Sequence, residues 1–255
     1  IKMKQILIRA DDLGYSRAVN YGVYDAIHNG IINNVGVMVN MPATEQGLDL
    51  LKNEDIDFGM HTDITNGKPI LSPEQIPSLV DEHGNFKRSK IYRDNYGKPD
   101  FTNLDEVVAE IDAQYHRFLD LVGKKPDYFE GHAVMSDNFI KGLHIVAEKY
   151  DLPILDFAFD NQPVGFKKET RFSPYMESMK PNYDPEKVFL AMLEHNDEKV
   201  IPMMICHPGY LDQYILNTSS LTIPRTQEVD FAMDPKIREI IEKEQIHLVR
   251  YSECK

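Results

Sequence analysis

Short apolar runs alternate with amphipathic helical stretches from one end of the chain to the other, and this alternation constrains the fold most strongly. Continuous or alternating apolar runs of about four to eight residues predict strands, whereas apolar residues three and four positions apart predict helices. The predicted strands are residues 5–10, 34–40, 56–61, 127–132, 153–156, 200–207 and 246–250. The predicted helices are residues 17–29, 43–52, 104–122, 138–150, 185–196 and 235–243, the last with Asp234 as its N-cap.

Strands and helices that alternate in this way predict an α/β fold of parallel βαβ units. Seven predicted strands favour closure into a single β/α barrel, one catalytic domain over residues 1–255, and an open doubly wound sheet is the alternative. Two long irregular stretches, residues 63–103 and 157–184, each follow a predicted strand. In a barrel these positions carry the substrate loops.

The charge of the chain excludes two classes of partner. Lys and Arg number 28 against 41 Asp and Glu, and the net charge of −13 repels both nucleic acid and anionic membranes. The apolar stretches are far shorter than the roughly 20 residues that cross a bilayer, and the first residues do not resemble a signal peptide, so we expect a cytoplasmic protein. Two cysteines, Cys206 and Cys254, are too few for a disulfide framework and are expected to be free thiols.

Two adjacent carboxylates, Asp11 and Asp12, end the first predicted strand, and Ser16 follows as a candidate helix cap. Holding two carboxylates close together is costly unless a cation or a shared proton relieves their repulsion, so the pair indicates a functional site. Both can reach one cavity only if Gly14 lets the backbone turn. The alternative is that one caps a turn while the other faces solvent.

Three histidines, His61, His132 and His207, end three other predicted strands. The catalytic groups of a barrel come from the C-terminal ends of several strands, so these histidines and the carboxylate pair are expected to converge. One carboxylate and two imidazoles, with positions left open, suit a catalytic divalent metal. The other six histidines are predicted to be structural or exposed: His28, His83, His116, His144, His195 and His247.

Several common catalytic arrangements are excluded. A Cys206–His207 nucleophile fails because neighbouring residues on a strand face opposite sides. The chain has no G-x-S-x-G elbow, Walker A loop or G-x-G-x-x-G fingerprint, which removes the usual serine-hydrolase, nucleotide and dinucleotide interpretations.

A series of motifs spans essentially the whole chain. They read ADDLGYS at 10–16, NYG at 20–22, GMH at 59–61, TNGKP at 65–69, GKKP at 123–126, EGH at 130–132 and CHP at 206–208. In this order they resemble the YdjC-like carbohydrate deacetylases, the family that includes the chitooligosaccharide deacetylases. One departure follows His132, where those enzymes typically carry further histidines in an Asp-x-His-x-His-x-His run and this chain has Val134, Met135 and Ser136.

The resemblance implies a seven-stranded barrel of the glycoside hydrolase/deacetylase type and removal of acetyl groups from small N-acetylated mono- or oligosaccharides, phosphorylated or not. It implies Asp11 as the base and a divalent metal on Asp12, His61 and His132, with Mg²⁺ the expected ion and Zn²⁺ the alternative. We expect a protonated His207 to donate to the leaving amine. The absence of Trp favours a short sugar, and the sequence leaves a homodimer open.

Three other functions fit parts of the same pattern. A sugar isomerase or epimerase would also bind a divalent ion at the strand ends. A glycosidase would pair Asp11 or Asp12 with Glu130. An inactive sugar-binding protein would explain the missing histidines after His132. Four basic residues are candidates for binding an anionic substituent of the sugar: Arg9, Lys68, Arg88 and Arg93.

Overall fold

The computed structural model describes residues 3–132, 134–158 and 162–255. The strands are β1 (Gln5–Leu13), β2 (Asn34–Val37), β3 (Asp57–Thr62), β4 (Phe129–Gly131), β5 (Val164–Phe166), β6 (Thr170–Tyr175), β7 (Ile201–Cys206) and β8 (His247–Leu248). Seven of them form one path in the order β4-β3-β2-β1-β7-β6-β5, and β8 pairs with β1. Along this path only the β5–β6 pair is antiparallel.

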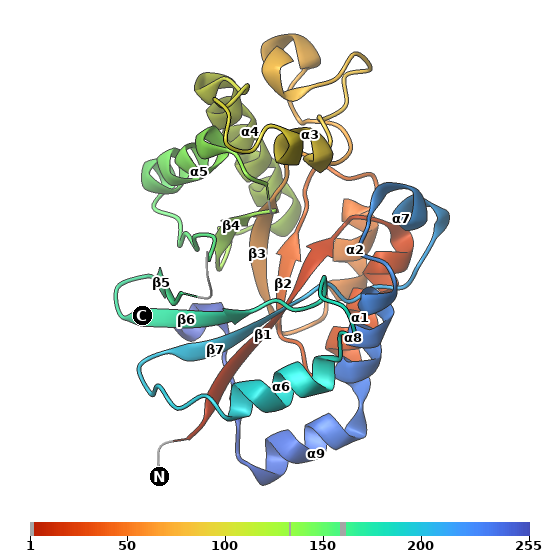
Figure 1. The fold of residues 1–255 in the computed structure, drawn as a ribbon, viewed down its shortest axis with the longest axis vertical. Coiled ribbons are helices and arrows are strands. Elements are labelled where there is room, and N and C mark those ends of the chain that lie inside the picture. Colours follow the sequence, from red (N-terminus) through yellow and green to blue (C-terminus); the bar gives the residue numbers. More distant parts are fainter. Residues whose placement is uncertain (1–2, 133, 159–161) are drawn as a thin grey trace.

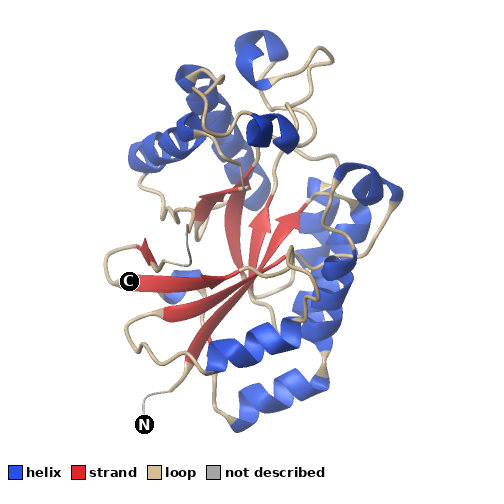
Figure 2. Cartoon of the chain, in the orientation of Figure 1, coloured by secondary structure: helices blue, strands red, loops and turns tan. Residues whose placement is uncertain are grey.

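The helices lie outside the curled sheet, and α1 and α8 run side by side next to β1 (Figures 1 and 2). They are α1 (Arg17–His28), α2 (Thr44–Leu51), α3 (Ser89–Asp94), α4 (Leu104–Val122), α5 (Asp137–Tyr150), α6 (Pro185–Leu193), α7 (Gln213–Thr218), α8 (Ile223–Met233) and α9 (Pro235–Lys243). Short 3₁₀ turns occur at Pro73–Gln75, Pro77–Leu79 and Tyr251–Glu253. Among the described helices none is long and apolar enough to cross a membrane.

Residues 153–156 lie between the two edges of the seven-strand path. Ile154 forms a parallel bridge with Phe129 of β4, and Leu155 forms an antiparallel bridge with Phe166 of β5. Hydrogen bonds of 2.9 Å from Phe129 N to Pro153 O and from Leu155 N to Phe129 O complete this connection. The predicted α/β barrel class is therefore confirmed, and the open doubly wound alternative does not describe this sheet.

The strands of the barrel differ in part from those predicted. Residues 153–156 contribute isolated bridges rather than a full strand, and the predicted strand at 246–250 pairs only with Gln5 and Ile6 at the start of β1. The hairpin of β5 and β6 lies inside residues 157–184, which were predicted to be irregular. This hairpin was missed because β6 contains Arg171 and Pro174 and is only partly buried, so its residues do not alternate between apolar and polar as those of a predicted strand do.

Among the helices, α4 and α9 have the predicted bounds, and Asp234 caps α9 by accepting from Lys236 N. Three helices were missed, namely α3, α7 and α8. The first two have only six residues each, too few for an apolar period. Helix α8 lacks an apolar stripe because Arg225 and Glu228 are buried beside its apolar residues.

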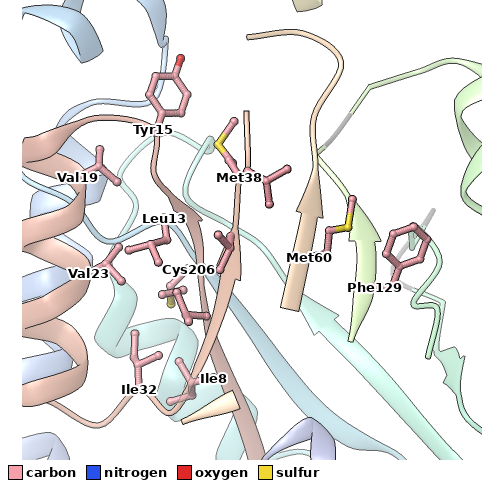
Figure 3. Close-up of a cluster of buried hydrophobic side chains, with 14 of the residues drawn as sticks. Ile8, Leu13, Tyr15, Val19, Val23, Ile32, Met38, Met60, Phe129 and Cys206 are labelled. Carbon is pink, nitrogen blue, oxygen red and sulfur yellow. The ribbon is translucent and has the colours of Figure 1, made fainter. Parts of the chain in front are cut away.

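Strand β1 supplies side chains to two separate apolar clusters. Ile6, Ile8 and Ala10 face the helices, whereas Leu7 faces the inside of the barrel. Figure 3 shows Leu13 directed toward Val19 and Val23 of α1. Because side chains alternate along a strand, Leu7, Arg9 and Asp11 of β1 all face the inside of the barrel. The interior is therefore apolar at its base, at Leu7, and charged above it, at Arg9 and Asp11.

The base of the barrel contains a pair of stacked tyrosines. The rings of Tyr128 and Tyr251 lie 3.9 Å apart, centroid to centroid, and both side chains are fully buried. Tyr128 fills the space that a side chain at Gly59 would need, because a Cβ at Gly59 would lie 2.2 Å from Tyr128 Cζ. Glycine at position 59 therefore allows this ring to enter the barrel below His61.

We predict that Gly59→Ala destabilises the protein by about 1–3 kcal/mol, because the added methyl group must displace a packed ring. Gly165→Ala is the matched control, since a Cβ there meets nothing within 4 Å and should change stability by less than about 0.5 kcal/mol. Urea unfolding of both variants measures the difference. Equal stability of the two variants would contradict the packing described here.

Candidate metal and catalytic site

The backbone of β1 turns at Asp12 itself. Asp12 has a φ of +74°, and the pairing of β1 with β2 shifts register between Ala10 and Leu13. A straight strand would direct Asp11 and Asp12 to opposite faces, whereas this left-handed residue brings both carboxylates to one cavity. A left-handed backbone costs a residue with a Cβ about 1–2 kcal/mol. The turn was predicted at Gly14, whereas this strained conformation occurs two residues earlier, at Asp12. Gly14 is left-handed as well, with a φ of +100°.

Asp12, His61 and His132 meet at the C-terminal ends of β1, β3 and β4. Asp12 Oδ1 lies 3.2 Å from His61 Nε2 and 3.3 Å from His132 Nδ1, and the two ring nitrogens are 2.9 Å apart. Two ligands adjacent on an ion at ordinary metal–ligand distances are separated by roughly 3.0–3.4 Å. Asp12 Oδ1 is buried and has no hydrogen-bond partner. These three residues therefore fit a divalent metal ion.

Glu130 fixes the orientation of His61. Its Oε1 pairs with His61 Nδ1, which leaves Nε2 as the nitrogen that faces Asp12 and His132. Burial alone would lower the pKa of His61, but the carboxylates of Glu130, Asp11 and Asp12 outweigh it, and the pKa lies well above its usual range. A carboxylate behind a histidine in this way is typical of metal sites.

Arg9 lies below two buried carboxyl groups and pairs with both of them, Asp11 and Glu130. Arg9 Nε is 2.9 Å from Asp11 Oδ1, while Nη2 is 3.1 Å from Asp11 Oδ2 and 3.4 Å from Glu130 Oε2. Its guanidinium also lies over the ring of Tyr128 and donates to the Tyr251 hydroxyl at 3.2 Å. Arg9 is therefore a buried cation already paired with two carboxylates, which does not favour it among the candidates for binding an anionic substituent.

His207 follows β7 and faces Asp11. His207 Nε2 is 3.9 Å from Asp11 Oδ2, and Nδ1 is buried without a hydrogen-bond partner. Burial lowers the pKa of His207 to about 4, so its imidazole is neutral near pH 7. To donate a proton as expected, His207 has to gain one first, which the sequence could not show because it does not reveal how completely this ring is removed from water.

Helix α8 supplies two buried charged residues that the sequence analysis missed. Arg225 Nη2 donates to Asp12 Oδ2 at 2.9 Å, and Glu228 Oε2 accepts from His207 N at 2.8 Å. Burial alone would raise the pKa of Asp12, but Arg225 and the adjacent rings of His132 and His61 keep it well below its usual range. The only sequence signal was the spacing of Arg225 and Glu228, three residues apart and therefore on one helix face.

The charged groups form the floor of a cavity of about 580 Å³. One wall is polar and comes from the loop after β3, from α3 and from the chain after α7. It contains Asn66, Ser89, Arg93, Thr218, Ser219 and Ser220. The other wall is mostly apolar and contains Val134, Met135, Phe157, Val164, Met176 and Met179. Arg93 therefore lines the cavity. Arg88 does not line it, and its side chain donates to Thr218 O.

The remaining histidines do not line this cavity, as predicted. Five of them pair with carboxylates, in the pairs His28–Glu54, His83–Glu82, His116–Asp112, His144–Asp156 and His247–Glu253. The described residues thus bring together Asp11, Asp12, His61, His132 and His207.

The chain matches the family described as YdjC-like protein over residues 5–243. Carbohydrate deacetylase 2 of Listeria innocua serovar 6a is 30% identical over 254 residues, which cover 97% of each protein. A chitooligosaccharide deacetylase of Yersinia enterocolitica serotype O:8 is 28% identical over 263 residues, which cover 98% of this chain and 99% of that one.

Two solved structures share the fold. A protein of Enterococcus faecalis V583, described as a candidate cellobiose-phosphate cleavage protein, superposes with a TM-score of 0.82 and 26% identity over 99% of both chains. A family 4 acetyl xylan esterase of Clostridium thermocellum, solved with a cobalt ion, superposes with a TM-score of 0.52 and 11% identity. It covers 98% of this chain and 89% of the esterase, and this second likeness concerns the fold alone.

Glu228 makes stability depend on pH. Burial raises the pKa of Glu228 to about 8 from an ordinary 4.5, so the folded chain keeps a proton that the unfolded chain releases at lower pH. Stability therefore falls as pH rises from about 4.5 to about 8. We predict that Glu228→Gln removes this fall, because Gln can still accept from His207 N.

The difference in free energy of unfolding between Glu228→Gln and the wild type should therefore increase by up to about 1.4 kcal/mol for each unit by which the pH is raised within this range. Urea unfolding between pH 5 and pH 8, with a chelator present, measures it. Glu242→Gln on the exposed face of α9 is the control and should show no such trend. A difference for Glu228→Gln that stays constant with pH would contradict a protonated Glu228.

Proposed function

The chain belongs to the YdjC-like protein family, and from this premise we propose that it is a metal-dependent hydrolase that removes acetyl groups from N-acetylated mono- or oligosaccharides. The observation that carries the proposal is the convergence of a metal-binding triad with Asp11 and His207 on one cavity floor. We also propose that residues 1–255 act as one β/α-barrel catalytic domain, since the groups come from the ends of β1, β3, β4 and β7.

In this proposal Asp12, His61 and His132 hold the divalent metal. Mg²⁺ is the ion expected from the family resemblance, and Zn²⁺ is the alternative, since two imidazoles and one carboxylate suit it well. Such an ion polarises an acetyl carbonyl and lowers the pKa of water. Glu130 supports the site by holding His61 with Nε2 toward the ion.

Asp11 is the proposed base. Its carboxylate lies beside the triad and faces His207, so it can take a proton from the attacking water. Arg9 holds both Asp11 oxygens from below, which keeps the carboxylate oriented. Because Arg9 covers the Asp11 carboxylate from below, a substrate can approach that carboxylate only from the cavity side.

His207 is the proposed acid. An amide nitrogen leaves only if it is protonated, and general acid help is typically worth about 10²–10⁴-fold in rate. Because the resting imidazole is neutral, His207 must gain its proton during the reaction, and the nearest carboxyl group that could supply it is Asp11, 3.9 Å away. One proton can thus pass from water through Asp11 and His207 to the departing sugar amine.

The cavity favours a short sugar with distinct faces. Its volume of about 580 Å³ lies within the usual range of small-molecule sites, about 300–1,000 Å³. Hydroxyl and amide side chains on one wall suit sugar hydroxyls, and Phe157 and the methionines of the other suit the apolar face of a ring. A glycosidase is disfavoured because its acid, Glu130, is held between His61 and Arg9.

We predict that Asp11→Asn abolishes acetate release while the metal stays bound, because Asn cannot accept the proton of the attacking water. Acetate is measured with short N-acetylglucosamine oligomers and their phosphates, with magnesium, zinc or a chelator. Asp49→Asn, on the exposed face of α2, is the control and should match the wild type. Full turnover by Asp11→Asn, or metal-independent release by the wild type, would refute the assignment.

His207→Ala should lower kcat by about 10²–10⁴-fold through loss of the general acid, with the metal content unchanged. Metal analysis and acetate release on the same preparations separate these two effects. His83→Ala, in an exposed turn, is the control. Loss of the metal in His207→Ala would mean that the roles assigned to His207 and to one of the triad histidines must be exchanged.

A further inference from the structure

The two oxygens of the Asp12 carboxylate have different surroundings. Oδ1 faces His61 and His132 and accepts no hydrogen bond, whereas Oδ2 accepts from Arg225 Nη2 at 2.9 Å. The whole side chain is buried, with 1% of its residue surface exposed. Only one of the two oxygens is therefore free to bind an ion.

Hydrogen bonds and a ring contact hold the side chain of Arg225, while its Nη1 is buried without a hydrogen-bond partner among the described residues. Its Nε donates to Leu221 O at 2.8 Å, Nη2 reaches Ser219 Oγ at 3.4 Å, and the guanidinium lies over the ring of Tyr15, 5.4 Å from its centroid. Its backbone oxygen accepts from Gly209 N, which ties α8 to the loop after His207. Arg225 therefore cannot follow a movement of Asp12, and it holds Oδ2 at a fixed point.

We propose that Arg225 is a positioning residue that keeps Asp12 a monodentate ligand and so leaves one coordination position open for water or for the acetyl oxygen. This inference rests on the proposed metal site and deepens it. A carboxylate can bind an ion through one oxygen or through both, and binding through both would fill a position that the reaction needs.

The consequence of removing the guanidinium follows from burial. Without Arg225, Oδ2 would be a charged and almost fully buried oxygen that has lost its hydrogen-bond donor, which is costly. The metal is the remaining cation within reach of a rotation about the Cβ–Cγ bond of Asp12. The carboxylate should therefore turn until both oxygens contact the metal and displace a water molecule.

The test counts the water molecules on the ion directly. Mn²⁺ replaces the native metal, its dissociation constant is measured by titration, and water-proton relaxation gives the number of exchangeable waters, all without sugar. Arg225→Met should lose about one water relative to the wild type while its Mn²⁺ dissociation constant changes by less than about tenfold. Its kcat should fall by roughly 10- to 100-fold, the usual effect of a residue behind a metal ligand.

Two further variants complete the experiment. Arg225→Lys keeps the positive charge beside Oδ2 and should therefore keep the wild-type number of waters. It replaces Arg225→Met as the test variant if Arg225→Met does not fold, and a changed water count in Arg225→Lys would then contradict the inference. Arg238→Met is the control, because Arg238 is exposed on α9 and its side chain donates to Gly30 O.

The outcomes separate this inference from the proposed function. A wild-type number of waters in Arg225→Met, whatever its kcat, would overturn the inference, as would a Mn²⁺ affinity that falls more than 100-fold with the water count unchanged. If the wild type binds Mn²⁺ but releases no acetate from any sugar, the proposed function fails while the water count still decides the role of Arg225. If the wild type binds no Mn²⁺, both fail.

Discussion

The structure depends on how three buried carboxylates are neutralised. Asp11, Asp12 and Glu130 are all enclosed, and carboxylates so close together repel one another unless cations lie between them. Arg9 supplies one cation from inside the barrel and Arg225 supplies another from α8. The carboxylates of Glu130, Asp11 and Asp12 raise the pKa of His61 and so favour a proton on its ring as a third positive charge. A divalent ion would replace that proton, so metal binding and protonation of His61 oppose each other.

This balance explains why the barrel interior is layered as it is. The apolar base, with Leu7 and the stacked tyrosines, excludes water from below Arg9, and the absence of water strengthens each ion pair above it. Helix α8 closes the same layer from outside by holding Asp12 through Arg225 and the backbone of His207 through Glu228. One helix thus positions both a proposed ligand and the proposed acid.

Much of the site could be predicted from sequence because parallel strands end at one face of a barrel. Asp11, Asp12, His61, His132 and His207 each end a predicted strand, and the structure brings them together. Arg225 and Glu228 could not be found in this way, because buried charges remove the apolar stripe that predicts a helix. The turn at Asp12 was also hidden, since a non-glycine residue rarely takes a positive φ without the tertiary contacts that hold it there.

The barrel is least strongly held at residues 153–156. Two isolated bridges and a few backbone hydrogen bonds join the edges there, whereas ladders connect the strands elsewhere along the path, with one register shift in the β1–β2 pair. Leu155, Asp156 and Phe157 of this seam also line the cavity. Local opening costs the least free energy where backbone pairing is sparsest. The apolar wall of the cavity therefore lies where the barrel opens most easily, whereas the proposed metal ligands Asp12 and His61 lie at the ends of the laddered strands β1 and β3.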